Sequence, residues 1–114
     1  MRVAIIDYGM GNIRSVFNAV KYLGGEAIVA EKPEDAWGDK LIIPGVGAFR
    51  DGIRNLEKFI PAIKSHLNSG LPLLGICLGL QMFFESSEEH PEVEGLGIIN
   101  GEVVKIPTRY KLPH

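Results

Sequence analysis

The sequence is short of cysteine and histidine. Its 114 residues include one cysteine, Cys77, and three histidines, His66, His90 and His114. A single cysteine cannot form an internal disulfide, and no cluster of cysteine and histidine has the spacing of metal ligands. The shortage excludes a disulfide scaffold, indicates a reducing compartment and gives no reason to expect a metal.

Long apolar runs and an excess of one charge are also missing. No run approaches the roughly 18 residues that cross a bilayer, and Asp7 interrupts the apolar N-terminus too early for a secretory signal. The net charge is −2 with acids and bases mixed, so no basic footprint for nucleic acid is present. We therefore expect a cytoplasmic protein of one small domain, residues 1–114, that binds neither membrane nor nucleic acid.

Short apolar runs alternate with apolar stripes at helical spacing. The runs predict buried strands at residues 3–6, 27–30, 41–43 and 71–76. One helix is predicted where Gly24-Gly25 ends a stripe of apolar residues, Ile13, Val16, Phe17, Val20 and Leu23. A second stripe, which Asp51 is expected to cap and Pro61 to kink or split, consists of Ile53, Leu56, Ile60, Ile63 and Leu67.

The C-terminal third differs from this alternation. A short helix is predicted at residues 78–85, and Asn100-Gly101 between two β-rich runs predicts a hairpin within residues 96–106. Strands that are apolar on both faces and alternate with helices favour an α/β fold, a parallel sheet covered on two sides. Ligand chemistry in such sheets gathers at the carboxyl ends of the strands, here residues 7–12, residues 44–47 and Cys77.

Cys77 lies between two glycines at a predicted strand-to-helix junction. The order Gly75-Ile76-Cys77-Leu78-Gly79 has the spacing of a nucleophile elbow with cysteine in place of serine. A sharp turn of this kind requires small neighbours two positions away, and it exposes the central side chain above the sheet. The alternative is a buried cysteine that acts as a small hydrophobic residue. The flanking glycines favour the nucleophile.

The segment Pro44-Gly45-Val46-Gly47 ends the neighbouring predicted strand. Its glycines permit backbone N–H groups to approach the thiol and, with the N–H of Leu78, to form an oxyanion hole. An ordinary Pro-Gly turn explains the segment equally well. Gly9 and Gly11 lack the spacing of a phosphate or dinucleotide loop, so no cofactor is expected.

Four segments carry a resemblance to a known family. Residues 75–81, "GICLGLQ", resemble the nucleophile motif of class I glutamine amidotransferases. Residues 5–16, "IIDYGMGNIRSV", residues 41–49, "LIIPGVGAF", and residues 86–106 are similar to the glutaminase subunits of imidazole glycerol phosphate synthases, within that family. The resemblance implies the three-layer parallel-sheet sandwich of the class I glutamine amidotransferase type and covers essentially the whole chain.

The resemblance also implies roles for residues. Cys77 would attack glutamine and form a glutamyl thioester, and Val46, Gly47 and Leu78 would stabilise the oxyanion. Gln81 resembles the residue that holds glutamine; otherwise it is a solvated helix position. In the family, ammonia passes to a cyclase subunit in a heterodimer of histidine biosynthesis, and Asn12 is the candidate contact with that partner.

The sequence departs from the family pattern in one respect. The family's histidine and glutamate, two residues apart near the C-terminus, have no counterpart here, and residues 111–114 resemble the beginning of a longer family segment. His66 is expected to be solvated, His90 to lie in a loop and His114 at the terminus. We therefore expect an N-terminal portion of a single glutamine amidotransferase domain, with the C-terminal part missing and poor turnover alone.

Two other functions stay open at this level. The chain is either the glutaminase half of an ammonia-transferring synthase, a non-catalytic α/β module whose Cys77 is packed and whose glycine loops bind a partner, or another cysteine-elbow hydrolase. The first two hypotheses differ in whether Cys77 is exposed and reactive.

Overall fold

The computed structural model describes residues 1–107, and its centre is a four-stranded parallel sheet. The strand order is β2-β1-β3-β4. The strands are β1 (Arg2–Ile6), β2 (Glu26–Ala30), β3 (Lys40–Ile43) and β4 (Leu73–Gly75). Ile5 lies opposite Val29 on one side and Ile42 on the other, so the apolar runs align in register. The predicted parallel sheet is confirmed.

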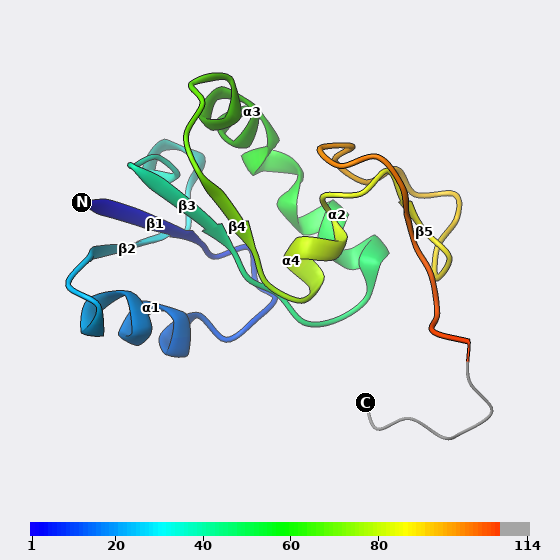
Figure 1. Ribbon diagram of the computed structural model, residues 1–114, viewed down its shortest axis with the longest axis horizontal. Helices are drawn as coiled ribbons and strands as arrows, with labels where there is room; N and C mark the ends of the chain where they lie inside the picture. Colours follow the sequence, from blue (N-terminus) through cyan, green and yellow to red (C-terminus); the bar gives the residue numbers. More distant parts are fainter. Residues whose placement is uncertain (108–114) are drawn as a thin grey trace.

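Helices cover both faces of this sheet (Figure 1). The helix α1 (Ile13–Tyr22) packs on one face, where its stripe contacts Val3, Ile5 and Ile42. The helices α2 (Phe49–Leu56) and α3 (Ile60–Asn68) pack on the other face, over a core that includes the strand side chains Ala4, Ile6, Leu41 and Ile43. Two short 3₁₀ turns, η1 (Pro33–Asp35) and η2 (Glu57–Phe59), complete these layers. The predicted three-layer architecture is confirmed, and within residues 1–107 every helix is too short or too polar to cross a bilayer.

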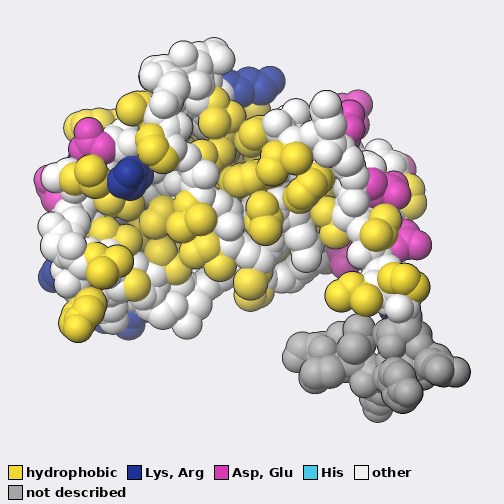
Figure 2. Space-filling model, in the orientation of Figure 1, with side chains coloured by type: hydrophobic (Ala, Val, Ile, Leu, Met, Phe, Trp, Pro, Cys, Tyr) yellow, Lys and Arg dark blue, Asp and Glu magenta, His cyan; other side chains and the backbone are white. Residues whose placement is uncertain are grey.

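Coverage of the sheet is uneven on the α1 face. Leu74 of β4 lies opposite Ile42 in the register, yet 54% of its surface is exposed. Apolar side chains are visible across much of the molecular face in Figure 2. The prediction that every strand is buried on both faces is therefore wrong at β4, because α1 packs mainly on β1 and β2.

Two helix boundaries differ from the prediction. Leu23 follows the end of α1 and is 83% exposed, because Gly24, with φ of +89°, turns the chain before the stripe reaches that residue. Asp51 lies within the first turn of α2 and does not cap it; Ala48 occupies the cap position. The predicted split at Pro61 is confirmed, since η2 separates α2 from α3 and Pro61 lies in the first turn of α3.

The predicted hairpin near the end is wrong. The strands β5 (Ser86–Ser87) and β6 (Glu102–Val103) form a parallel pair instead. The N–H groups of Leu96 and Ile99 bond the carbonyl oxygens of Met82 and Phe83 at 2.8 and 2.9 Å, which draws the first β-rich run away from the second. Gly101 in turn exchanges hydrogen bonds with Glu85. The short helix α4 (Leu78–Gln81) also ends earlier than predicted.

Candidate active site

Three loops meet at the carboxyl edge of the sheet. The Tyr8 hydroxyl, from the loop after β1, donates a hydrogen bond to the Pro44 carbonyl oxygen after β3 at 2.5 Å. The Gly45 carbonyl oxygen then accepts a hydrogen bond from the N–H of Leu78, after β4, at 3.1 Å. The predicted convergence of residues 7–12, residues 44–47 and Cys77 is confirmed.

Cys77 occupies the turn between β4 and α4 in a strained backbone conformation. Its φ is +52° and its ψ is −116°, and among residues 1–107 no other non-glycine residue has a positive φ. Such a conformation costs on the order of 1–3 kcal/mol and is concentrated at functional sites. The side chain is exposed. The geometry is that of the predicted elbow. It disagrees with the alternative, in which Cys77 is packed and buried as a small hydrophobic residue.

The glycines on either side of Cys77 are sterically required. A Cβ on Gly79 would lie 1.8 Å from the Ile43 carbonyl oxygen. A Cβ on Gly75 would lie 2.7 Å from the Leu80 Cα and 2.6 Å from the Phe83 ring. The end of β4 and the start of α4 approach too closely for any side chain at these positions. This is the steric reason for which the sequence analysis expected small residues on either side of Cys77.

The residues predicted to stabilise an oxyanion adjoin this turn. Val46 and Gly47 are exposed, and Gly47 has a φ of +125°, which favours glycine. The N–H of Leu78, however, is bonded to the Gly45 carbonyl oxygen. In this conformation that donor is occupied, so an oxyanion would have to replace the Gly45 carbonyl. The role of Val46, Gly47 and Leu78 stays a prediction.

Gln81 lies one helical turn after the cysteine. Its N–H donates to the Cys77 carbonyl oxygen at 3.0 Å. The exposed side chain borders a groove of about 580 Å³ whose other walls are Ser87, Glu88, Glu89, Val103, Val104 and Lys105. A groove beside the predicted nucleophile is where a substrate would lie. Sequence reasoning did not single out its other walls. Their only signal was the family resemblance of residues 86–106.

Asn12, the predicted contact with a partner, caps α1. Its Oδ1 accepts a hydrogen bond from the N–H of Ser15 at 3.3 Å, and the residue is exposed. Capping by asparagine stabilises a helix start by about 0.5–2 kcal/mol. The contact with a partner stays a prediction. Sequence reasoning missed the structural role of Asn12 as the cap of α1.

The comparisons with known proteins fit this geometry. Residues 4–110 match the profile of the family described as "Glutamine amidotransferase class-I". The chain belongs to the class I glutamine amidotransferase family. A solved structure titled "Crystal structure of glutamine amidotransferase" is similar, with a TM-score of 0.75 and 25% identity. The match covers 90% of this chain and 55% of the solved chain.

Curated relatives narrow the similarity within the family. The chain is 48% identical to the "Imidazole glycerol phosphate synthase subunit HisH" of Aquifex aeolicus, over 100% of this chain and 57% of the relative. Identity to the subunit of the same name from Bacillus cereus is 50%, over 98% of this chain and 55% of the relative. The chain thus spans little more than half the length of these relatives.

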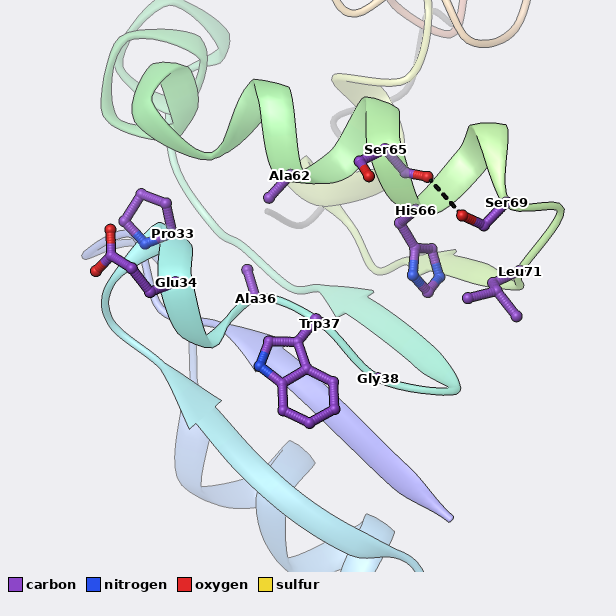
Figure 3. A pocket seen from close by; sticks show the side chains of 10 residues that line it. All are labelled: Pro33, Glu34, Ala36, Trp37, Gly38, Ala62, Ser65, His66, Ser69 and Leu71. Carbon is purple, nitrogen blue, oxygen red and sulfur yellow. Dashed lines mark hydrogen bonds between the residues drawn. The ribbon is translucent and has the colours of Figure 1, made fainter.

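His66 is buried, contrary to the prediction. Only 6% of its surface is exposed, and its Nε2 lies 2.7 Å from the Pro72 carbonyl oxygen. A carbonyl only accepts, so Nε2 carries the proton. His66 borders a cavity of about 400 Å³ with Trp37 and Leu71 (Figure 3). Because Pro72 precedes β4 and Cys77 follows it, His66 lies at the wrong end of the strand to serve as the base.

His90 is not hydrogen-bonded to the described site. The buried Nδ1 of His90 lies 3.6 Å from Glu89 Oε1 and has no hydrogen-bond partner within residues 1–107. His114 and the resembling segment 111–114 lie outside the described residues. Residues 1–107 therefore contain the predicted nucleophile, Cys77, without a hydrogen-bonded base.

Proposed function

We propose that this chain carries the nucleophile of a glutaminase subunit of imidazole glycerol phosphate synthase. The observation that carries the proposal is the exposed, strained Cys77 between two glycines that admit no side chain. The family description, "Glutamine amidotransferase class-I", supplies the substrate class, and the name shared by relatives of about 50% identity supplies the synthase. Glutamine is the substrate, and glutamate and ammonia are the products.

The reaction proceeds in two steps at Cys77. Its Sγ bonds to the carboxamide carbon of glutamine, the C–N bond breaks, and the nitrogen leaves with a proton as ammonia. Water then attacks the thioester, which releases glutamate and restores the thiol. The N–H groups of Val46 and Gly47 stabilise the negative oxygen of each tetrahedral intermediate, joined by that of Leu78 when the oxyanion replaces the Gly45 carbonyl oxygen as its acceptor. Gln81 holds the substrate in the adjoining groove.

The proton transfers require a base that residues 1–107 do not place at the sulfur. The family resemblance assigns that base to a histidine oriented by a glutamate further along the chain. Without them, Cys77 is acylated slowly and turnover is poor. Ammonia passes to a cyclase subunit, with which the chain forms a cytoplasmic heterodimer. This heterodimer acts as a lyase in histidine biosynthesis. Asn12 contacts the cyclase subunit.

The test is glutamate formation by a subunit that carries both this chain and the histidine and glutamate assigned by the family resemblance, assembled with its cyclase subunit. The wild type should convert glutamine to equal amounts of glutamate and ammonia, and Cys77→Ala should lower kcat at least about 10³-fold while the fold is retained. Assembly that forms no glutamate, or a Cys77→Ala variant with wild-type turnover, would contradict the proposal.

A further inference from the structure

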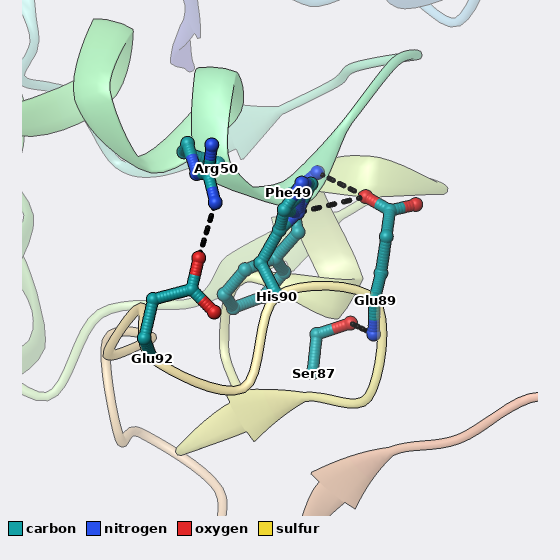
Figure 4. A network of polar contacts seen from close by, with 6 residues as sticks. All are labelled: Phe49, Arg50, Ser87, Glu89, His90 and Glu92. Atoms are coloured by element: carbon teal, nitrogen blue, oxygen red, sulfur yellow. Dashed lines mark hydrogen bonds and ion pairs between the residues drawn. The ribbon is translucent and has the colours of Figure 1, made fainter.

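The first turn of α2 is capped by a residue forty positions away. Ala48 at its N-cap makes no side-chain hydrogen bond, although helix starts generally use a local serine, threonine, aspartate or asparagine. Instead, Glu89 Oε1 accepts a hydrogen bond from the N–H of Phe49 at 2.8 Å (Figure 4). A carboxylate at this position also interacts favourably with the positive end of the helix dipole.

Glu89 is itself held in place by its neighbours. Its N–H donates to the Oγ of Ser87 at 3.2 Å, and Ser87 is 3% exposed. The buried Nδ1 of His90, which has no hydrogen-bond partner within residues 1–107, lies 3.6 Å from the Oε1 that binds Phe49 (Figure 4). The carboxylate oxygen therefore lies between a backbone donor and an imidazole nitrogen, on a short segment anchored to β5.

The capped helix start is one end of the loop beside Cys77. Residues 44–48 connect the last residue of β3, Ile43, to Phe49, which is only 1% exposed. The sheet fixes the β3 end of this loop, and the bond to Glu89 fixes the α2 end. Glu89 also borders the groove that contains Gln81. One side chain thus joins the groove to the loop that supplies the proposed oxyanion donors.

We propose that Glu89 is a positioning residue for the reaction of Cys77. By holding the start of α2, it keeps the 44–47 loop aligned with the elbow, and a change at Glu89 displaces Val46 and Gly47 from the reacting carbon. This inference rests on the proposed function. A neighbouring acid provides a matched control. Glu92 forms an exposed ion pair with Arg50 of α2, and within residues 1–107 it accepts no hydrogen bond from a helix N–H.

The experiment measures two labelling rates of Cys77 in the full chain. 6-Diazo-5-oxonorleucine, a glutamine analogue, forms a thioether with the sulfur and releases N₂, while iodoacetamide reports only access to the thiol. Glu89→Ala should slow the analogue about tenfold or more, because small misplacements of catalytic groups reduce rates strongly. Its iodoacetamide rate should change less than about twofold, and Glu89→Gln, whose amide oxygen still accepts from Phe49, should recover part of the loss.

Hydrogen exchange of the peptide covering residues 44–52 supplies a second readout. Exchange should accelerate in Glu89→Ala and stay at the wild-type rate in Glu92→Gln, whose analogue rate should also stay within about twofold of the wild type because exposed ion pairs are weak. Glu89→Ala with wild-type analogue labelling and exchange overturns the inference alone. Equal slowing by both reagents overturns it too, since the defect is then general. Wild-type protein that reacts with iodoacetamide but never with the analogue overturns the proposed function and this inference with it.

Discussion

The hydroxyl of Tyr8 donates a hydrogen bond to the carbonyl oxygen of Pro44 at 2.5 Å, and both residues are buried. The bond joins the loop after β1 to the loop that precedes α2. A Cβ on Gly45 would lie 2.0 Å from the same hydroxyl, so the tyrosine also requires glycine at that position. Two of the three loops at the site therefore depend on one phenol.

Removal of this hydroxyl should destabilise the protein. Tyr8→Phe leaves the buried Pro44 carbonyl without its donor, which costs about 1–3 kcal/mol in the free energy of unfolding. Urea denaturation of both proteins measures the difference. Tyr22→Phe is the matched control, because Tyr22 is 90% exposed and its loss should have little effect. Equal unfolding midpoints for Tyr8→Phe and the wild type would contradict the importance of the bond.

Stability should also fall in alkali because of Tyr8. Burial raises the pKa of Tyr8 above its usual value of 10.0, so above that pH the unfolded chain loses this proton and the folded chain keeps it. The contribution is complete below pH 10 and decreases as the pH rises, by up to about 1.4 kcal/mol per pH unit. Unfolding free energies between pH 9 and pH 11 test this, and Tyr8→Phe should show a shallower decrease than the wild type. Parallel pH profiles for the two proteins would rule the explanation out.

Space at the elbow predicts a difference between two glycine substitutions. Gly79→Ala places a methyl group 1.8 Å from the Ile43 carbonyl oxygen, and the strand and helix must separate, at a cost of at least about 3 kcal/mol in unfolding free energy. Gly70 has a φ of +73° but no atom within 4 Å of its Cβ position, so Gly70→Ala should cost only about 1–2 kcal/mol from backbone strain. Thermal unfolding compares the two. An equal loss of stability would mean that the elbow tolerates bulk.

Local patterns predicted much of the sheet and of the elbow. The apolar runs located the four central strands, and the glycines around Cys77 predicted its turn because the steric need involves neighbours two positions away. The errors arise where distant contacts outweigh a local preference. Asp51 is not the cap because Glu89, from a segment remote in sequence, binds the first turn of α2.

The same reason accounts for the other errors. Asn100-Gly101 forms no hairpin because Glu85 and the residues after α4 bind the backbone around it. The buried His66 donates a hydrogen bond from its Nε2–H to the Pro72 carbonyl oxygen, a contact that helical periodicity does not predict. The N–H of Leu78 is occupied because it donates to Gly45, which lies on a separate loop. The sequence therefore predicted which residues lie near the thiol, but not which of their N–H groups are free to donate.

The most direct test is the position of the covalent label left by the glutamine analogue on the folded full chain. Peptide mass spectrometry should find one equivalent of 6-diazo-5-oxonorleucine on the peptide that contains Cys77, with labelling slowed by excess glutamine and absent in Cys77→Ser. A folded chain whose Cys77 stays unmodified, or whose label lies on another residue, would contradict the account of a thiol raised above the sheet to attack glutamine.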